Sequence, residues 1–147
     1  MARAPLQVLV IPYRKAASGG HEFAVFHCAG GSMWQFVSGG AEDQETPIEA
    51  AKRELFEEAG ITSAPHWLAL DSRGSVPRTA FPQATHWPKD VLVVPEHPFA
   101  VDVTSMEIQL SPEHSEFKWL GYDEAMRVLT WETNRTALWE LGQRLAG

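Results

Sequence analysis

The chain has 147 residues, a length that suits one domain able to bury its core without disulfide bonds or a structural metal. Nineteen acidic residues against twelve basic ones give a net charge of −7, and no basic cluster is longer than the pair Arg14-Lys15. We therefore expect no general binding to nucleic acid, because such binding requires a basic face.

Cysteine content and hydropathy favour a soluble protein of a reducing compartment. The single cysteine, Cys28, cannot form a disulfide within the chain. The longest apolar run near the N-terminus, residues 8–11, is far too short to span a membrane, and no signal peptide is recognisable. The expected location is the cytoplasm, with no membrane partner.

Six apolar, β-branched or aromatic segments predict strands, and glycine-rich turns separate the first three. These segments are residues 6–12, 22–27, 34–37, 91–94, 99–103 and 116–120. Residues 63–90 show no clear period. They have room for one or two short strands that the sequence does not place.

One long helix is predicted from its caps. Thr46 and Glu49 form a capping box around a proline at the first helical position, so the helix should run to Ala59 and end at Gly60. Its apolar residues lie in one stripe that should face the core. The stripe consists of Ile48, Ala51, Leu55 and Ala59.

Two further helices are predicted near the C-terminus. The first covers residues 123–129, and the second covers residues 133–145, where leucines recur at helical spacing. Strands and helices in this order predict a single α/β domain with a mixed sheet.

Three glutamates of the long helix form an acidic cluster. Glu54, Glu57 and Glu58 are spaced so that their side chains lie on the flanks and back of the helix. Arg53 can offset only part of their mutual repulsion. A cluster of this kind is commonly a solvated helix face. The alternative is a site for a hard cation, since Mg²⁺ and Mn²⁺ prefer oxygen ligands.

A longer pattern decides between these two interpretations. Residues 39–61 read G-x5-E-x7-R-E-U-x-E-E-x-G-U, where U is an apolar residue. Seven identities at fixed offsets, each with a background frequency of about 5–7%, match by chance at fewer than about one start in 10⁸. The pattern resembles the signature of the Nudix hydrolases at every defining position.

The resemblance implies a fold, a reaction and a cofactor. The implied fold is an α/β/α sandwich around a mixed β-sheet, with one domain over residues 1–147. The implied reaction is the hydrolysis of a diphosphate linkage in a nucleoside diphosphate joined to another group. The implied cofactor is Mg²⁺, for which Mn²⁺ can substitute.

The same resemblance implies roles for single residues within this pattern and for Ser38, which directly precedes it. The expected metal ligands are Glu54, Glu57 and Glu58. Ser38, Gly39 and Gly40 are expected to contact the substrate, and a carbonyl of the first two is a candidate for a further ligand. Arg53 and Glu45 are expected to orient the glutamates.

Three motifs outside this pattern resemble the bacterial dihydroneopterin triphosphate diphosphatases, whose relatives are often described as dATP pyrophosphohydrolases. They are Trp34-Gln35-x-Val37-x-Gly39-Gly40, Glu113-His114-x4-Trp119 and Thr133-Asn134-Arg135-x-Ala137. The motifs imply that a small nucleoside or pterin triphosphate is cleaved with release of pyrophosphate. Cys28 departs from this subgroup, in which a basic residue is expected at that position.

Further candidates lie outside residues 39–61. Glu113 is expected to bind the metal or act as the base, with Glu116 as the competing candidate, and Glu113 can instead be a solvent-exposed loop acid. If residues 116–120 form a strand, Phe117 and Trp119 face inward and Glu116 faces solvent. The candidate substrate contacts are Arg3, Trp34, Asn134 and Arg135. Each of these also has a structural interpretation, as a terminal charge, a core side chain or the start of the last helix.

The expected reaction is direct attack of water on phosphorus, because the chain carries no motif for a covalent nucleophile. Glu58, Glu54 or Glu113 would accept the proton of that water, since a positioned carboxylate can act as a general base. One alternative is a Nudix hydrolase of a nucleotide sugar, a dinucleoside polyphosphate or an oxidised nucleotide. Another is a module that binds a nucleotide without cleaving it. The sequence leaves the oligomeric state open between a monomer and a homodimer.

Overall fold

Four consecutive apolar residues lie at the centre of the molecule. In the computed structural model, which describes residues 3–147, they belong to β1 (Arg3–Lys15), and none of them is more than 1% exposed. Val8 faces one hydrophobic cluster, whereas Leu9 faces another on the opposite side of the sheet. A strand that is apolar on both faces has to be covered on both faces.

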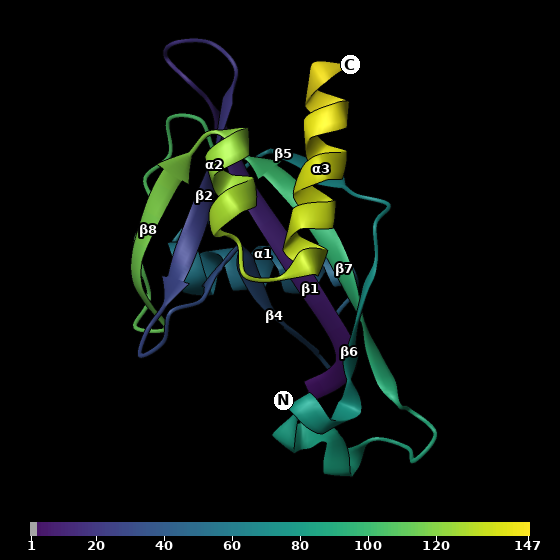
Figure 1. The fold of residues 1–147 in the computed structure, drawn as a ribbon. Coiled ribbons are helices and arrows are strands. Elements are labelled where there is room, and N and C mark those ends of the chain that lie inside the picture. The colour runs from purple at the N-terminus through teal and green to yellow at the C-terminus, as the bar shows by residue number, and fades with distance from the viewer. Residues whose placement is uncertain (1–2) are drawn as a thin grey trace.

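β1 belongs to an eight-stranded mixed sheet (Figure 1). The other strands are β2 (His21–Cys28), β3 (Trp34–Gln35), β4 (Val37–Glu42), β5 (His66–Ala69), β6 (Gly74–Pro77), β7 (Val93–Asp102) and β8 (His114–Leu120). The main order is β3-β2-β1-β7-β5, with β4 paired to β1, β6 to β7 and β8 to β2. β1 and β7 run parallel, and the other pairs are antiparallel.

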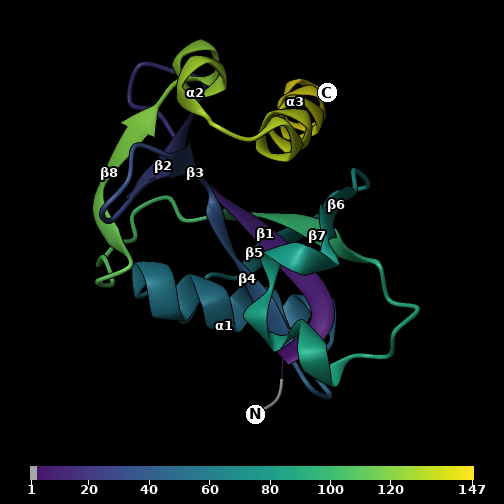
Figure 2. The same ribbon diagram turned by 60° about the horizontal axis from the view of Figure 1, so that its bottom comes forward.

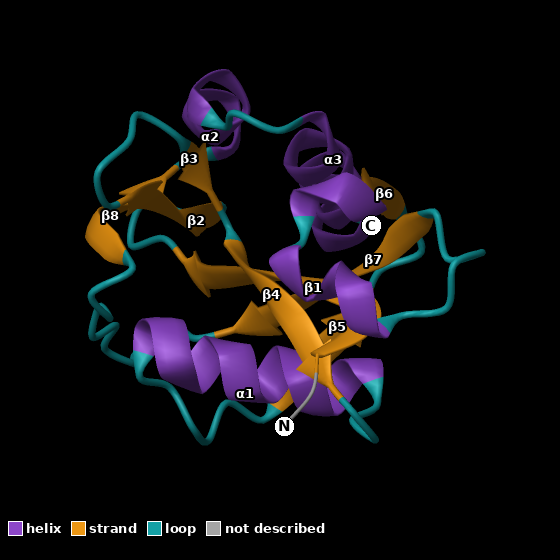
Figure 3. Cartoon of the chain, turned by 90° about the horizontal axis from the view of Figure 1, so that it is seen from below, coloured by secondary structure: helices purple, strands orange, loops and turns teal. Residues whose placement is uncertain are grey.

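Helices cover both faces of this sheet, as Figures 2 and 3 show. α1 (Pro47–Ala59) packs against the cluster that contains Val8, while α2 (Tyr122–Val128) and α3 (Glu132–Ala146) pack against the cluster that contains Leu9. The expected α/β/α sandwich with a mixed sheet is therefore confirmed. Within the part of the chain that the structure describes, no helix is both long enough and apolar enough to span a membrane.

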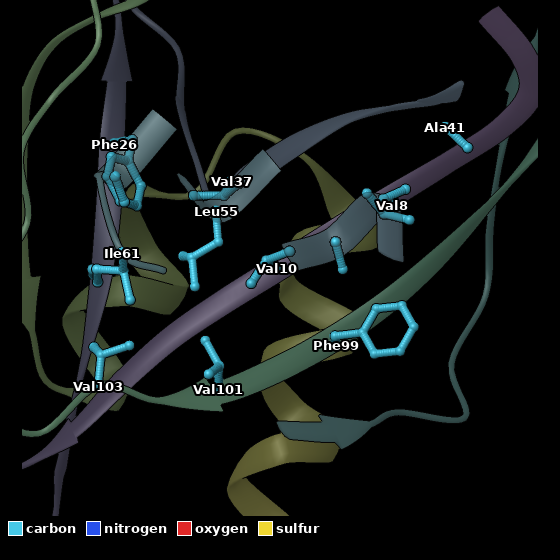
Figure 4. Packing of buried hydrophobic residues seen from close by; sticks show 14 residues of the cluster. Val8, Val10, Phe26, Val37, Ala41, Leu55, Ile61, Phe99, Val101 and Val103 are labelled. Carbon is cyan, nitrogen blue, oxygen red and sulfur yellow. The ribbon is translucent and has the colours of Figure 1, made fainter. Parts of the chain in front are cut away.

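The apolar stripe of α1 holds this helix on the sheet. Leu55, which is 1% exposed, projects between Val37 and Val10 (Figure 4). Burying a leucine side chain contributes roughly 1.5–3 kcal/mol to stability. Of the four stripe residues, three are buried and only Ile48 is half-buried.

The ends of α1 follow the prediction. The Thr46 hydroxyl accepts a hydrogen bond from the Glu49 backbone N–H, and the Glu49 carboxylate accepts one from the Thr46 backbone N–H. Gly60 adopts a φ of 72° and ends the helix. The predicted bounds of α1 are therefore confirmed, and α2 and α3 lie within one residue of theirs.

The predicted strand at residues 34–37 is divided in the structure. β3 pairs with β2, and after Phe36 the chain continues as β4, which pairs with β1 through Gly39 and Gly40. Sequence patterns missed β4 because glycine is rare in strands, yet its backbone still makes ladder hydrogen bonds. β4 therefore owes its extended conformation to its pairing with β1.

Two other predicted strands, residues 91–94 and 99–103, form the single strand β7. It contains Pro95 and Pro98, which lack an N–H donor but keep their carbonyl acceptors. The Pro98 carbonyl accepts a hydrogen bond from the Leu70 N–H at 3.0 Å, so the proline does not interrupt the sheet.

Residues 63–90, which showed no period, contain β5, β6 and two short 3₁₀ helices. These are η1 (Arg78–Ala80) and η2 (Pro82–His86). We call residues 70–92, which connect β5 to β7, the arm. Its tip lies beside the start of β1 (Figure 1), where the Trp87 indole N–H donates to the Arg3 carbonyl at 2.7 Å.

Candidate active site

β4 brings two glycines against two charged side chains. A Cβ on Gly39 would lie 2.2 Å from the carboxyl carbon of Glu54, and a Cβ on Gly40 would lie 2.2 Å from Nε of Arg3. Neither glycine could be larger unless these groups moved. The glycines therefore let an acidic and a basic side chain approach the same stretch of backbone.

Arg53 connects the loop before α1 to the helix. Its guanidinium donates two hydrogen bonds to the Glu45 carboxylate, at 2.8 and 2.9 Å, and one to the Gly40 carbonyl at 2.8 Å. Its Nη1 lies 3.0 Å from the carboxylates of both Glu54 and Glu57. The hydrogen bonds between Arg53 and Glu45 lower the pKa of the acid and raise the pKa of the base. Arg53 is thus held by Glu45 in a position from which it can orient the carboxylates of Glu54 and Glu57.

Glu58 lies deepest of the three glutamates. It is 2% exposed, its Oε1 lies 3.5 Å from Nε2 of His114, and no described residue hydrogen-bonds its Oε2. The predicted position of Glu58 beside the apolar stripe did not reveal its burial, because His114 at the start of β8 covers that side of the helix. The side chain of Glu57 is 49% exposed and fits the prediction.

The environment of Glu54 and Glu58 suits a divalent cation. Burial raises the pKa of both side chains, and the proximity of Glu54 raises the pKa of Glu58 further. Burial also lowers the pKa of His114, which favours the neutral ring. Two adjacent carboxylates, one half-buried and one buried, ionise together more readily when a cation compensates them. The residues present fit Mg²⁺ or Mn²⁺, since both ions prefer carboxylate oxygens and the unpaired Oε2 is available as a ligand.

The structure brings the four predicted metal ligands together only in part. Glu54 and Glu58 are close enough to affect each other's pKa, and Glu113 lines the same cleft as Glu54. Glu57 instead pairs with Arg53 at the surface. Among residues 3–147, no three His, Cys, Asp or Glu side chains are gathered into a ready-made metal centre. The complete ligand set is therefore still a prediction.

A cleft of about 550 Å³ opens in front of Glu54. Its lining residues come from β1, β4, α1, the arm and the loop before β8: Arg3, Gln7, Ser38, Gly39, Gly40, Ala41, Glu42, Arg53, Glu54, Ala80, Phe81, Pro82 and Glu113. The Arg3 guanidinium stacks over the Phe81 ring, 4.7 Å from its centroid, and no described residue accepts a hydrogen bond from its buried Nε. The cleft therefore has carboxylates on one wall and a partly unpaired cation on another.

A second pocket of about 410 Å³ continues from this cleft. The two cavities share Gln7, Ser38, Ala80 and Phe81. The rest of the second pocket is formed by Gln35, Ser75, Val76, Pro77, Glu96, Trp131, Thr133 and Asn134. Since the cleft is mainly polar and the pocket mainly apolar, together they can hold a molecule with an anionic chain and a ring.

The two acids near β8 occupy different positions. Glu116 is exposed on the strand, whereas Phe117 and Trp119 pack against the cluster beneath α1, as strand alternation predicts. Glu113 precedes the strand and lines the cleft. Of these two acids, Glu113 is the one near the other carboxylates.

Two predicted substrate contacts lie away from both cavities. Trp34 packs with the cluster beneath α2 and α3, and Arg135 forms an ion pair with Glu132 at 2.8 Å. Asn134 lines the second pocket, but its Oδ1 already accepts a hydrogen bond from the Phe36 N–H at 2.9 Å. Neighbouring helix residues point about 100° apart, so Arg135 faces elsewhere when Asn134 faces the sheet. Neither Trp34 nor Arg135 lines the cleft or the second pocket, so these cavities give no support to the prediction that they contact the substrate.

Sequence patterns missed three residues that line the site. Phe81 lies in the arm, where no periodic pattern was present, and Trp131 immediately precedes α3. Glu96 was missed because its strand was predicted as two pieces. The one feature of the sequence that could have identified Glu96 is its position as an acid between the two apolar runs of β7.

Comparisons with known proteins agree with this geometry. Residues 14–139 match the NUDIX domain family. An RNA pyrophosphohydrolase of Sulfurovum sp. is 30% identical over 106 residues, which cover 68% of this chain and 66% of that protein. The dihydroneopterin triphosphate diphosphatase of Haemophilus influenzae is 30% identical over 108 residues, which cover 72% of this chain and 68% of that protein. The chain thus spans about two thirds of the length of these relatives.

A solved structure extends the agreement to nearly the whole fold. The crystal structure of a NUDIX hydrolase from Listeria monocytogenes has 43% sequence identity and a TM-score of 0.86, and the match covers 97% of this chain and 95% of that chain. The family match alone covers most of the chain. The protein therefore belongs to the Nudix family of phosphoanhydride hydrolases.

Proposed function

We propose that this protein hydrolyses a nucleoside or pterin triphosphate, such as dATP or dihydroneopterin triphosphate, and releases pyrophosphate. The observation that carries the proposal is the proximity of half-buried Glu54 to buried Glu58 beside a cleft that also contains Arg3. A triphosphate needs cationic contacts along its chain, and the adjoining pocket has room for a ring. The motifs outside residues 39–61 also support a triphosphate substrate.

The residues of the cleft have distinct roles in this proposal. Glu54, Glu58 and Glu113, with Glu57 as a fourth candidate, would hold Mg²⁺ or Mn²⁺, which neutralises phosphate charge and lowers the pKa of a bound water. The Arg3 guanidinium would donate hydrogen bonds to phosphate oxygens. Glu113 is the preferred general base for the attacking water, because it lines the cleft from a loop outside the buried pair.

A second candidate function is that of an RNA pyrophosphohydrolase, the name of the Sulfurovum relative. The charge of this chain disfavours it. RNA adds many phosphates that basic side chains must neutralise, whereas the net charge is −7. Of the residues lining the cleft, only Arg3 and Arg53 are basic, and Arg53 is already bound to Glu45.

A substrate panel followed by phosphorus NMR tests these functions. The panel contains dATP, dihydroneopterin triphosphate, a nucleotide sugar, a dinucleoside polyphosphate, an oxidised nucleotide and a 5′-triphosphorylated RNA, each with Mg²⁺. We expect the free triphosphates to give pyrophosphate as the first product. Early orthophosphate, or preference for another class, would contradict the proposal. Binding without turnover of any compound would favour a non-catalytic module. A Glu58→Gln variant controls for contaminating hydrolases.

A further inference from the structure

Glu96 is the only acid among the described residues that line the second pocket. It lies in β7, opposite Gly74 of β6, and is 7% exposed. A Cβ on Gly74 would lie 2.7 Å from Cγ2 of Thr133 and 3.4 Å from Oε1 of Glu96, so the Thr133 side chain is a neighbour of this carboxyl group. A buried carboxyl group in a mainly apolar pocket is costly unless hydrogen-bond donors satisfy it.

The described lining of this pocket contains no lysine, arginine or histidine that could pair with Glu96. An ionised carboxylate offers about four acceptor sites, and the single Thr133 hydroxyl can fill only one of them. Buried polar groups in folded proteins nearly always find partners. Glu96 therefore has unused acceptor capacity at the wall of a cavity that is open to the cleft.

Aromatic side chains form the flat walls of the same pocket. The indole N–H of Trp131 donates to Oε1 of Gln35 at 3.0 Å, which fixes the orientation of the ring. Phe81 stands where the pocket joins the cleft, beneath the Arg3 guanidinium. Aromatic rings of this kind can stack on any planar heterocycle, because every base has a π-face. A ring in the pocket would therefore have its phosphate chain directed toward Arg3.

We propose that Glu96 selects the ring of the substrate by accepting two adjacent N–H donors from a 2-amino-4-oxopyrimidine edge, as found in guanine and pterin. The inference rests on the proposed function, because the pocket receives the ring only if the cleft receives the phosphates. Of the two substrates named there, it favours dihydroneopterin triphosphate over dATP. The edge of adenine offers a donor beside an acceptor, so it leaves one carboxylate oxygen unpaired. A site built to bind a substrate N–H strongly rejects analogues that lack it.

Calorimetric binding of dGMP, neopterin and dAMP tests this selectivity without any hydrolysis. The parent protein should bind dGMP and neopterin at least ~10-fold more tightly than dAMP, and Glu96→Gln should reduce that ratio to within ~3-fold, because the amide has lost one of its two acceptors. Glu124→Gln, an exposed change on α2, is the matched control and should keep the ratio. Equal affinities in the parent, or an unchanged ratio in Glu96→Gln, would overturn the inference.

Trp131→Ala keeps the inference testable if Glu96→Gln folds poorly. Loss of stacking should weaken all three probes by ~10-fold and leave their ratio unchanged. Unchanged affinities would mean that the ring binds elsewhere and would overturn the inference. Triphosphate turnover without any ring preference would overturn it too, while the proposed function would stand. Selective probe binding without triphosphate turnover would overturn only the proposed function.

Discussion

The two walls of the site are assembled in different ways. On the α1 side, the hydrogen-bond partners of Arg53 all lie within 13 residues of it along the chain. On the arm side, the hydrogen bond between Trp131 and Gln35 joins residues 96 positions apart, and Glu96 comes from yet another strand. The hydrogen bonds that orient the glutamates of α1 are therefore specified locally, whereas the ring pocket depends on the packing of the whole domain.

This difference separates chemistry from selectivity. The local wall concentrates charge, so changes there should act on the rate of hydrolysis. The arm side contributes shape, stacking and a single buried acid, so changes there should act on affinity and on local stability. If the division is right, variants of the acidic wall lower turnover more than affinity, and variants of the arm side do the opposite.

Removing the metal should have the largest effect. Chelation with EDTA should abolish hydrolysis, because Glu54 and Glu58 would then repel both each other and the phosphates, and added Mg²⁺ or Mn²⁺ should restore it. Pyrophosphate release measures the effect. Full activity in the presence of EDTA would contradict a metal-dependent reaction. Binding of neopterin should survive EDTA if the two walls act separately.

Loss of the proposed base should have the next largest effect. Glu113→Gln keeps the shape of the side chain but removes its basicity, so kcat should fall ~10²-fold or more, the range typical of general-base loss. A pure ligand would mainly raise the Mg²⁺ requirement instead. Glu116→Gln should stay within a few-fold of the parent, because that acid is exposed on β8. The assignment is wrong if, at limiting Mg²⁺, Glu113→Gln keeps parental activity while Glu116→Gln loses it.

Short-range rules explain how much of the acidic wall could be predicted from the sequence. The bounds of α1 followed from its capping box and its terminal glycine, both of which act within one helical turn. Helix periodicity also gave the stripe around Leu55. It could not reveal the burial of Glu58, because the covering residue, His114, belongs to a strand far along the chain.

The ring pocket could not be predicted for the same physical reason. Phe81, Glu96 and Trp131 follow no shared period, and they meet only because β6, β7 and the start of α3 pack together. β4 escaped detection because pairing with β1 overrides the poor strand propensity of Gly39 and Gly40. Tertiary context thus decided every feature that the sequence patterns missed.

Opening the arm should have a moderate effect. The Arg78 guanidinium donates to four carbonyls within the arm: Pro88, Val91, Ala84 and Trp87. Arg78→Ala should cost about 2 kcal/mol of local stability and speed tryptic cleavage after Lys89, because these carbonyls lose a charged donor. Since the arm carries Phe81, KM should rise more than kcat falls.

Arg127→Ala, an exposed change on α2, is the matched control for the arm variant. It should leave both the cleavage rate after Lys89 and KM unchanged. If Arg78→Ala also leaves cleavage unchanged, the pairing of β6 with β7 is sufficient to hold the arm. The arm would then not depend on the hydrogen bonds of Arg78 for its local stability.

A methyl group at Gly40 should have a smaller effect, because the Arg3 side chain it would meet is flexible. Gly40→Ala places a Cβ 2.2 Å from Nε of Arg3, which should displace the guanidinium from the cleft and raise KM by ~10-fold with little loss of stability. Gly31→Ala is the control, because an added Cβ there meets nothing within 4 Å. An unchanged KM in Gly40→Ala would mean that Arg3 does not bind the phosphates.

The smallest effect concerns the attachment of α3 to the base of the arm. Glu140 accepts hydrogen bonds from the backbone N–H groups of Asp71 and Ser72, both at 2.7 Å, and from Nε of Arg144 at 2.8 Å. Burial alone would raise the pKa of Glu140, but these hydrogen bonds outweigh burial and lower the pKa. The ionised form is therefore favoured in the folded chain.

A carboxyl group whose pKa is lower in the folded chain than in the unfolded chain stabilises the fold above its unfolded pKa, and this contribution is lost as the pH falls through the folded pKa. Glu140→Gln should therefore lower the free energy of unfolding by about 1 kcal/mol at pH 7. The difference from the parent should shrink as the pH falls below 4.5, the ordinary pKa of the group. Denaturant titrations over this pH range, with Glu124→Gln as the exposed control, measure the effect. A difference that does not change with pH would mean that Glu140 holds the arm by packing rather than by charge.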